Sequence, residues 1–130
     1  MGFPVLICDD SMLARKSAQR ALPIDWDAEV SFAANGREAI VALQRQHYGL
    51  LLLDLTMPEM DGVEVLEQIK ALGIEVFVVV ISGDIQPQMQ QRVRELGALD
   101  FIAKPVDSQR LQAILQGFGL YRPTAQSAHA

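Results

Sequence analysis

Acidic, hydroxyl and basic side chains follow four short apolar segments of this sequence. Asp9 and Asp10 follow the first of these segments, Asp54 follows the second, Ser82 ends the third and Lys104 follows the fourth. A carboxylate at the end of a buried segment is costly unless it has a partner. Two carboxylates about 4 Å apart repel each other by roughly 4 kcal/mol at an effective dielectric near 20. If the three acids meet, we therefore expect a cation among them.

These side chains favour phosphoryl transfer with a metal ion. The candidate ligands are carboxylate oxygens, which favours Mg²⁺ over zinc. Mg²⁺ usually keeps several waters and shares its coordination sphere with a phosphate. Lys104 then supplies a positive charge for that phosphate, and Ser82 supplies a hydrogen bond. Asp54 is the candidate nucleophile, whose carboxylate oxygen attacks phosphorus to form an acyl phosphate.

Strand-like and helix-like segments alternate along the chain. Short runs rich in branched apolar residues predict strands buried on both faces; they cover residues 5–8, 30–34, 50–53, 76–81 and 101–103. Amphipathic stretches between them predict helices; they cover residues 11–22, 36–46, 63–72, 87–96 and 108–118. This alternation predicts an α/β fold with right-handed crossovers. The carboxyl ends of parallel strands share one edge of the sheet, so the acids, Ser82 and Lys104 are expected there together.

Composition narrows the setting of the protein. The 130 residues suit a single domain, which we place at 1–119, followed by a flexible tail at 120–130. Sixteen acidic residues against 11 basic ones give a net charge of −5, which disfavours direct binding to nucleic acid. The single cysteine, Cys8, lies in an apolar run and predicts a buried, inert thiol in a reducing, cytoplasmic setting. No apolar run is long enough for membrane insertion.

The order and separation of the charged residues closely resemble the receiver domains of two-component response regulators. The matching motifs are Asp9-Asp10-Ser11, Asp54 followed by Met57-Pro58 and Asp61-Gly62, Ser82-Gly83, and Lys104-Pro105. The resemblance extends over residues 5–118. It implies a CheY-like fold, which is a flavodoxin-like, doubly wound sheet of five parallel strands in the order 2-1-3-4-5, flanked by five helices.

The resemblance also implies roles for the site residues. Asp54 is the phosphoacceptor, which receives a phosphoryl group from a histidine kinase or a phosphotransfer protein in the presence of Mg²⁺. Asp10 and Asp54 bind the metal directly, the backbone carbonyl of Thr56 adds a ligand, and Asp9 acts mainly through water. Ser82 and Lys104 hold the phosphoryl oxygens.

Other positions are implied to transmit or tune the signal. Ser82 and Phe101 match the switch positions, although Phe101 is also expected as an ordinary core residue. Thr56 and Asp84 match positions that tune the lifetime of the phosphate. The chain is expected to catalyse only its own phosphorylation and dephosphorylation. Its effector protein is expected to bind the face formed by the fourth predicted helix, the fifth strand and the fifth helix, at residues 87–96, 101–103 and 108–118.

Three other readings share parts of this pattern. A haloacid-dehalogenase-type phosphatase needs a second Asp two residues after the nucleophile, where this chain has Thr56. A flavodoxin-like flavin binder needs a phosphate loop after the first strand, where Asp9 and Asp10 would repel the phosphate. A pseudo-receiver that acts only by protein contact would lack an acid or the lysine, and none is missing. Arg15 and Lys16 are predicted to lie on a solvated helix face or to make a minor contribution to docking of a partner.

Overall fold

The computed structural model describes residues 2–84 and 86–123. Five parallel strands form one sheet in the order β2-β1-β3-β4-β5, which confirms the predicted doubly wound α/β fold. The strands are β1 (Phe3–Cys8), β2 (Ala28–Ala33), β3 (Leu50–Leu53), β4 (Phe77–Ser82) and β5 (Asp100–Ala103). Each strand begins and ends within two residues of the prediction.

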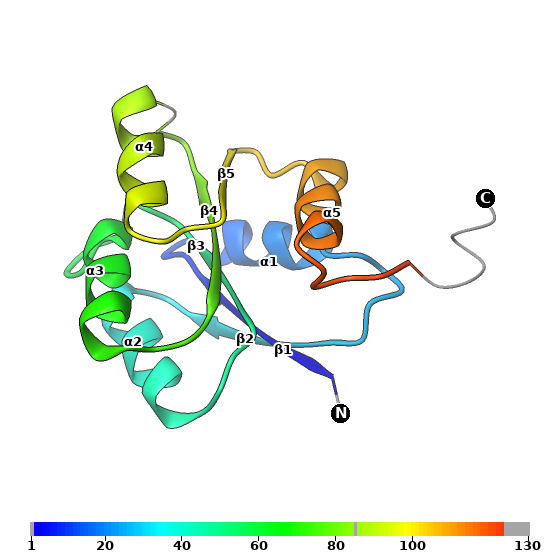
Figure 1. The fold of residues 1–130 in the computed structure, drawn as a ribbon, viewed down its shortest axis with the longest axis horizontal. Helices are drawn as coiled ribbons and strands as arrows, with labels where there is room; N and C mark the ends of the chain where they lie inside the picture. Colours follow the sequence, from blue (N-terminus) through cyan, green and yellow to red (C-terminus); the bar gives the residue numbers. More distant parts are fainter. Residues whose placement is uncertain (1, 85, 124–130) are drawn as a thin grey trace.

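Helices cover both faces of the sheet (Figure 1). They are α1 (Met12–Ala21), α2 (Gly36–Arg45), α3 (Gly62–Leu72), α4 (Pro87–Glu95) and α5 (Ser108–Gly117). α1 and α5 pack over one face, and α2, α3 and α4 pack over the other, so the core has two parts. Among the described residues, no helix is long and apolar enough to cross a membrane.

The central strand β3 shows why the predicted strands were recognisable. Its four leucines are all buried. Leu51 and Leu53 pack in the core beneath α2, α3 and α4, whereas Leu50 and Leu52 pack in the core beneath α1 and α5. A strand buried on both faces must be apolar at every position, so it appears in the sequence as a continuous run. Asp54 directly follows this fully buried strand, which holds its backbone in place.

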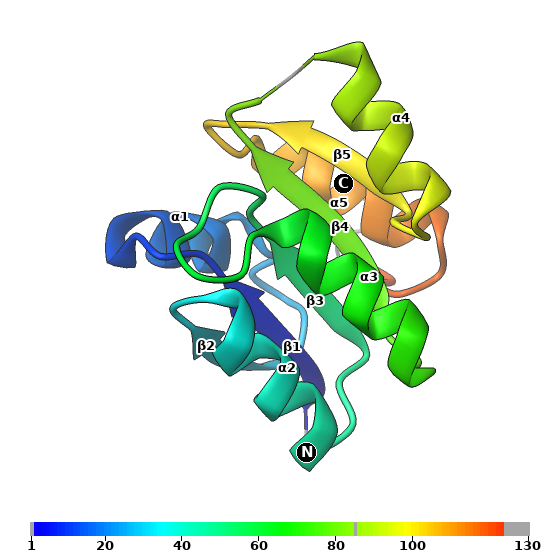
Figure 2. The same cartoon turned by 90° about the vertical axis from the view of Figure 1, so that its left-hand side faces the viewer.

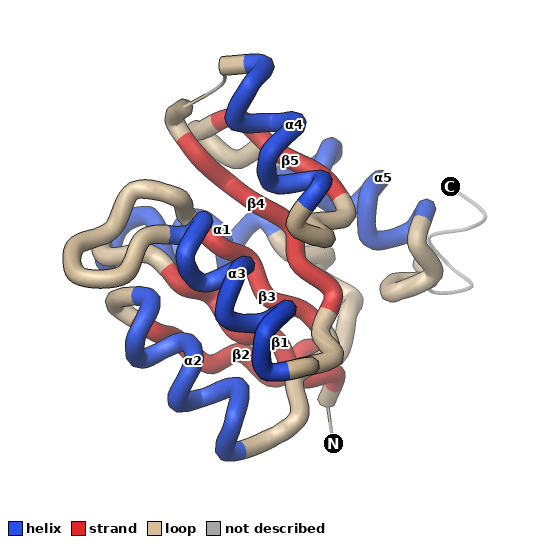
Figure 3. Tube along the Cα trace, turned by 60° about the vertical axis from the view of Figure 1, so that its left-hand side comes forward, coloured by secondary structure: helices blue, strands red, loops and turns tan. Residues whose placement is uncertain are grey.

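The strands end at one edge of the sheet. The arrowheads in Figure 2 point to that edge, and the loops that follow the strands gather along it in Figure 3. Local hydrogen bonds define where the helices begin next to these loops. Ser11, Asn35, Asp61 and Asp107 each accept a backbone N–H at the start of a helix. α4 has no such side-chain cap and begins with Pro87 instead.

The loop after β3 turns back sharply against the strand. The N–H of Gly62 donates to the carbonyl of Leu55 at 3.0 Å, and Asp61 with Glu64 forms a capping box at the start of α3. Glu59 has a φ of 67°, a left-handed conformation that non-glycine residues seldom adopt. These contacts hold the backbone on either side of the loop close to Asp54.

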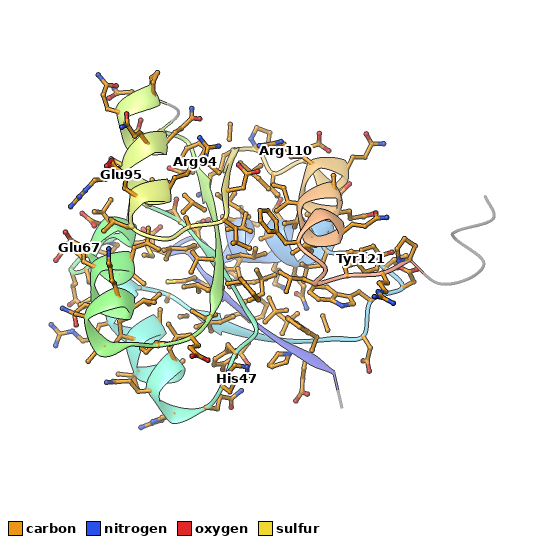
Figure 4. The ribbon with its side chains drawn as sticks, in the orientation of Figure 1. His47, Glu67, Arg94, Glu95, Arg110 and Tyr121 are labelled. Carbon is orange, nitrogen blue, oxygen red and sulfur yellow. The ribbon has the colours of Figure 1, made fainter. Side chains whose placement is uncertain are left out.

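The chain after α5 packs against the domain at the start of the predicted tail. The Tyr121 side chain, labelled in Figure 4, is buried, and its hydroxyl donates to the carboxylate of Asp25. Its ring meets Trp26 edge-on at 6.1 Å between centroids, and Trp26 in turn contacts Phe3 at 5.0 Å. Packing therefore continues through Tyr121, while residues 124–130 lie outside the described residues.

Gly62 offers a test of this close packing. A Cβ there would lie 2.4 Å from the carbonyl oxygen of Asp54 and 2.8 Å from the Cα of Leu55. Because both neighbours are backbone atoms, we expect Gly62→Ala to lower the free energy of unfolding by about 1–3 kcal/mol. Gly117→Ala is the control, since a Cβ there meets nothing within 4 Å. Urea unfolding should show a loss only at Gly62, and equal stability of the two variants would contradict this packing.

Candidate phosphoacceptor site

Three carboxylates meet at the carboxyl edge of the sheet. Oxygen atoms of Asp9, Asp10 and Asp54 all lie within 4.8 Å of one another. They meet because β1 and β3 are neighbours, with Cys8 paired to Leu53. The residues Asp9 and Asp54 are buried, at 5% and 4% exposure, whereas Asp10 is exposed. The prediction that the three acids cluster is therefore confirmed.

Lys104 bridges the two buried acids. Its Nζ lies 2.8 Å from Asp9 Oδ2 and 3.2 Å from Asp54 Oδ1. The backbone N–H of Lys104 donates to the carbonyl of Ser82 at 2.9 Å, which fixes the β5–α5 loop against the end of β4. The lysine that the sequence predicted as a phosphate ligand thus serves here as the counter-ion of two acids.

Burial and charge shift the pKa values of this pair in identifiable ways. Burial is the main cause of a raised Asp54 pKa, and the charge of Asp9 raises it further, against the opposing effects of Lys104 and the Thr56 backbone N–H. Burial alone would lower the pKa of Lys104. Its contacts with Asp9 and Asp54 outweigh burial and raise it. Lys104 is therefore charged at neutral pH. The ionised form of Asp54 remains less favourable in the folded protein than in water.

The chemistry of the donor set fits a hard divalent cation. The three carboxylates offer only oxygen ligands, and one of them, Asp10, faces solvent. A single lysine leaves the acids with an excess of negative charge. Thr56 lies close to this cluster, because its backbone N–H helps to lower the pKa of the Asp54 carboxylate. Mg²⁺ is the cation that such a partly solvated oxygen site suits best.

The remaining predicted site residues lie on β4 and β5 or just after them. Ser82 is fully buried at the end of β4, and its Oγ accepts the N–H of Asp84 at 3.1 Å. The Asp84 carboxylate accepts the N–H of Gln86 at 3.1 Å, so it stabilises the turn before α4. Phe101 is buried in the core that α2, α3 and α4 cover.

Arg15 is a residue of the site that the sequence reading missed. It was predicted on a solvated helix face with Lys16, but it is half-buried, and its Nη1 donates to the backbone carbonyl of Asp9 at 2.7 Å. The spacing of Arg15 could have indicated this position, because Arg15 lies three positions before Ala18 and four after Ser11. Residues three or four apart share a helix face, and Ala18 is buried.

A cavity of about 410 Å³ opens beside these acids, between α1 and the β5–α5 loop. Apolar side chains line most of it, including Leu13, Ile81 and Val106. Cys8 also borders it, with a buried side chain whose pKa burial raises to about 12. The prediction of a buried thiol is therefore confirmed, and at neutral pH this thiol is protonated and unreactive.

A parallel sheet that gathers two adjacent acids, a further acid after its central strand and a lysine after its last strand defines a class of signalling domain. The family model described as the response regulator receiver domain matches residues 5–116. The chain belongs to this family.

Known relatives agree with this assignment. The chemotaxis protein CheY of Bacillus subtilis is 33% identical over 115 residues, which cover 88% of this chain and 96% of that protein. The transcriptional regulatory protein ZraR of Escherichia coli K12 is also 33% identical over 88% of this chain, but the match covers only 26% of ZraR. This chain thus spans about a quarter of the length of several relatives and nearly all of CheY.

Solved structures show the same fold. A chain of the CheX–CheY–BeF₃–Mg²⁺ complex from Borrelia burgdorferi superposes with a TM-score of 0.83 at 28% identity, over 92% of this chain and 90% of that one. The receiver domain of AraT from Geobacillus stearothermophilus gives a TM-score of 0.78 at 30% identity, over 90% and 92% of the two chains.

The raised pKa of Asp54 predicts a pH-dependent cost in stability. Relative to the unfolded chain, folding disfavours its ionised form, so stability falls as the pH rises through the folded pKa. We expect Asp54→Asn to raise the unfolding temperature by several degrees at pH 7 without divalent cations, and by less at pH 4. Glu29→Gln, which changes an exposed carboxylate, is the control. Scanning calorimetry that finds Asp54→Asn no more stable than the parent would contradict this account.

Proposed function

We infer that this chain is a response-regulator receiver whose Asp54 accepts a phosphoryl group from a histidine kinase or phosphotransfer protein. The observation that carries the proposal is the position of Asp54, a buried carboxylate on a rigid strand end, within 4.8 Å of two other acids and 3.2 Å from Lys104. The family assignment to receiver domains supports the same reading. Beyond this self-modification the chain has no enzymatic activity of its own in our proposal.

The proposed reaction is a single phosphoryl transfer. A carboxylate oxygen of Asp54 forms a bond to phosphorus while the bond between phosphorus and the donor's imidazole nitrogen breaks, and the imidazole leaves with its electron pair. Lys104, now paired with Asp9 and Asp54, exchanges its contact with Asp54 for a phosphoryl oxygen. The Ser82 hydroxyl donates to another phosphoryl oxygen. Bound Mg²⁺ supplies positive charge that offsets the acids and the incoming phosphate.

We assign the metal ligands within this proposal to Asp10, Asp54 and the backbone carbonyl of Thr56. Asp9 acts mainly through water, because both of its carboxylate oxygens already accept hydrogen bonds, from the Ser11 N–H and from Lys104. Asp10 is the exposed member of the cluster and is the acid best placed to meet a hydrated ion.

The donor is proposed to be a protein that approaches over the start of α1. Met12 and Leu13 follow the acids directly and are exposed by 60% and 79%, so they offer apolar contact beside the reacting carboxylate. The apolar cavity under Leu13 widens that contact surface. Neither nucleic acid nor a membrane is a proposed partner, and we propose a cytoplasmic setting, where such donors and the reduced Cys8 thiol coexist.

The proposed output runs through β4, α4 and β5. Phosphorylation changes the charge that Ser82 and Lys104 face, and Ser82 is tied to the turn before α4 through Asp84. Phe101 on the neighbouring strand is the proposed switch aromatic, and the effector binds the α4-β5-α5 face. Thr56 and Asp84 are proposed to tune the phosphate lifetime. The domain boundary at residue 119 also remains a proposal.

Phosphorylation can be tested with a small acyl phosphate. Acetyl phosphate with Mg²⁺ should add one phosphoryl group that is labile to base, and Asp54→Asn should block the addition because the nucleophile is lost. Asp10→Asn should slow it, whereas Asp27→Asn, at an exposed loop carboxylate, should not. Intact-mass spectrometry measures the addition. Labelling that persists in Asp54→Asn would place the nucleophile elsewhere.

The route to the output face can be tested by hydrogen exchange. Beryllofluoride with Mg²⁺ mimics the phosphoryl group, and we expect it to change amide exchange in α4 and β5 as well as at the site. α4 is the expected responder because it has no side-chain N-cap and only Val93 fully buried. Asp54→Asn treated in the same way is the control. Changes confined to the loops that hold Asp10, Asp54 and Lys104 would rule out this route.

A further inference from the structure

We propose that Arg15 is a positioning residue for the metal site. It holds the turn Asp9-Asp10-Ser11 in the conformation that directs the Asp10 carboxylate toward Asp54. The proposal rests on the proposed function of this site and adds to it a residue on α1 that touches neither metal nor phosphate.

The contacts of Asp9 carry the argument. Its N–H donates to the carbonyl of Ala33 at 3.1 Å, as the last link of the pairing between β1 and β2. Its Oδ1 accepts the N–H of Ser11 at 2.9 Å, and its Oδ2 accepts Lys104 Nζ at 2.8 Å. Its carbonyl oxygen accepts Arg15 Nη1 at 2.7 Å. Arg15 is therefore the group that fixes the peptide plane between Asp9 and Asp10.

That peptide plane sets the direction of Asp10. Within residues 2–84 and 86–123, the Asp10 side chain has no hydrogen-bond or ion-pair partner of its own, so its position depends on the backbone on either side. The Ser11 side is held by the helix, because its Oγ accepts the N–H of Ala14 and its carbonyl accepts the N–H of Arg15. The Asp9 side is held by the Arg15 guanidinium. One residue thus anchors the turn from both ends.

Arg15 also has an effect of the opposite sign. Its positive charge lies near the acids and must weaken the attraction of any cation to them. If charge were its main influence, removing the guanidinium would tighten metal binding. Positioning predicts the reverse, so the direction of the change decides between the two. Groups that orient metal ligands through hydrogen bonds typically change metal affinity by 10- to 100-fold when removed.

The test compares Arg15→Met with Lys16→Met. Methionine keeps an unbranched apolar stem but has neither the donors nor the charge of arginine. Lys16 is the matched control, an exposed cation at the next position of the same helix. Mg²⁺ titration by calorimetry should give a dissociation constant roughly tenfold higher for Arg15→Met and nearly unchanged for Lys16→Met. Arg15→Lys, which keeps a charged donor, should restore most of the affinity.

Kinetics and stability separate positioning from general damage to the fold. In phosphorylation by acetyl phosphate, Arg15→Met should need more Mg²⁺ for half-maximal rate and reach nearly the parent rate at saturating Mg²⁺, with thermal unfolding close to that of Lys16→Met. Unchanged or tighter Mg²⁺ binding by Arg15→Met overturns the positioning role while leaving the proposed function intact. A parent protein that binds no Mg²⁺ overturns both.

Discussion

The mutual repulsion of Asp9 and Asp54 is the constraint on which this architecture depends. Both carboxylates are buried at the ends of adjacent strands, where water cannot screen them well. Lys104 lies within 3.2 Å of both and offsets part of that repulsion. Holding the acids this close requires a firmly packed backbone around them. The all-leucine strand β3, the loop packed against the backbone of Asp54 and the helix that carries Arg15 provide this packing.

The opposite end of β5 shows how the same sheet joins the helices of the proposed output face. Asp100 accepts Arg94 from α4 at 3.0 Å and Arg110 from α5 at 3.4 Å, and the two arginines are labelled in Figure 4. Arg110 also donates to the carbonyl of Phe101 at 3.2 Å. Half-exposed ion pairs of this kind contribute little to stability. Their geometry nonetheless means that a shift of the backbone at Phe101 changes contacts on both helices.

Much of this arrangement was predictable because it depends on patterns that a sequence displays directly. Continuous apolar runs mark strands buried on both faces, and the residues after them fall at one edge of a parallel sheet. The clustering of Asp9, Asp10, Asp54 and Lys104 follows from those two facts. The contacts of Arg15 and Tyr121 could not be predicted in this way. Arg15 reaches a backbone carbonyl with its long side chain, and Tyr121 reaches Asp25, which is distant in the sequence. The pattern of polar and apolar residues does not show which partner a long side chain contacts.

The hydrogen bond from Lys104 to Asp9 joins residues 95 positions apart. Every strand pair in this sheet is parallel, and each needs a crossover connection, so residues far apart in the sequence must meet to complete the site. The acids of β1 and β3 are synthesised well before the lysine that offsets their charge. A growing chain that has reached only α4 carries the acidic cluster without its internal cation. Under the proposed function, the site is therefore complete only once the chain extends past the last strand, β5, to Lys104.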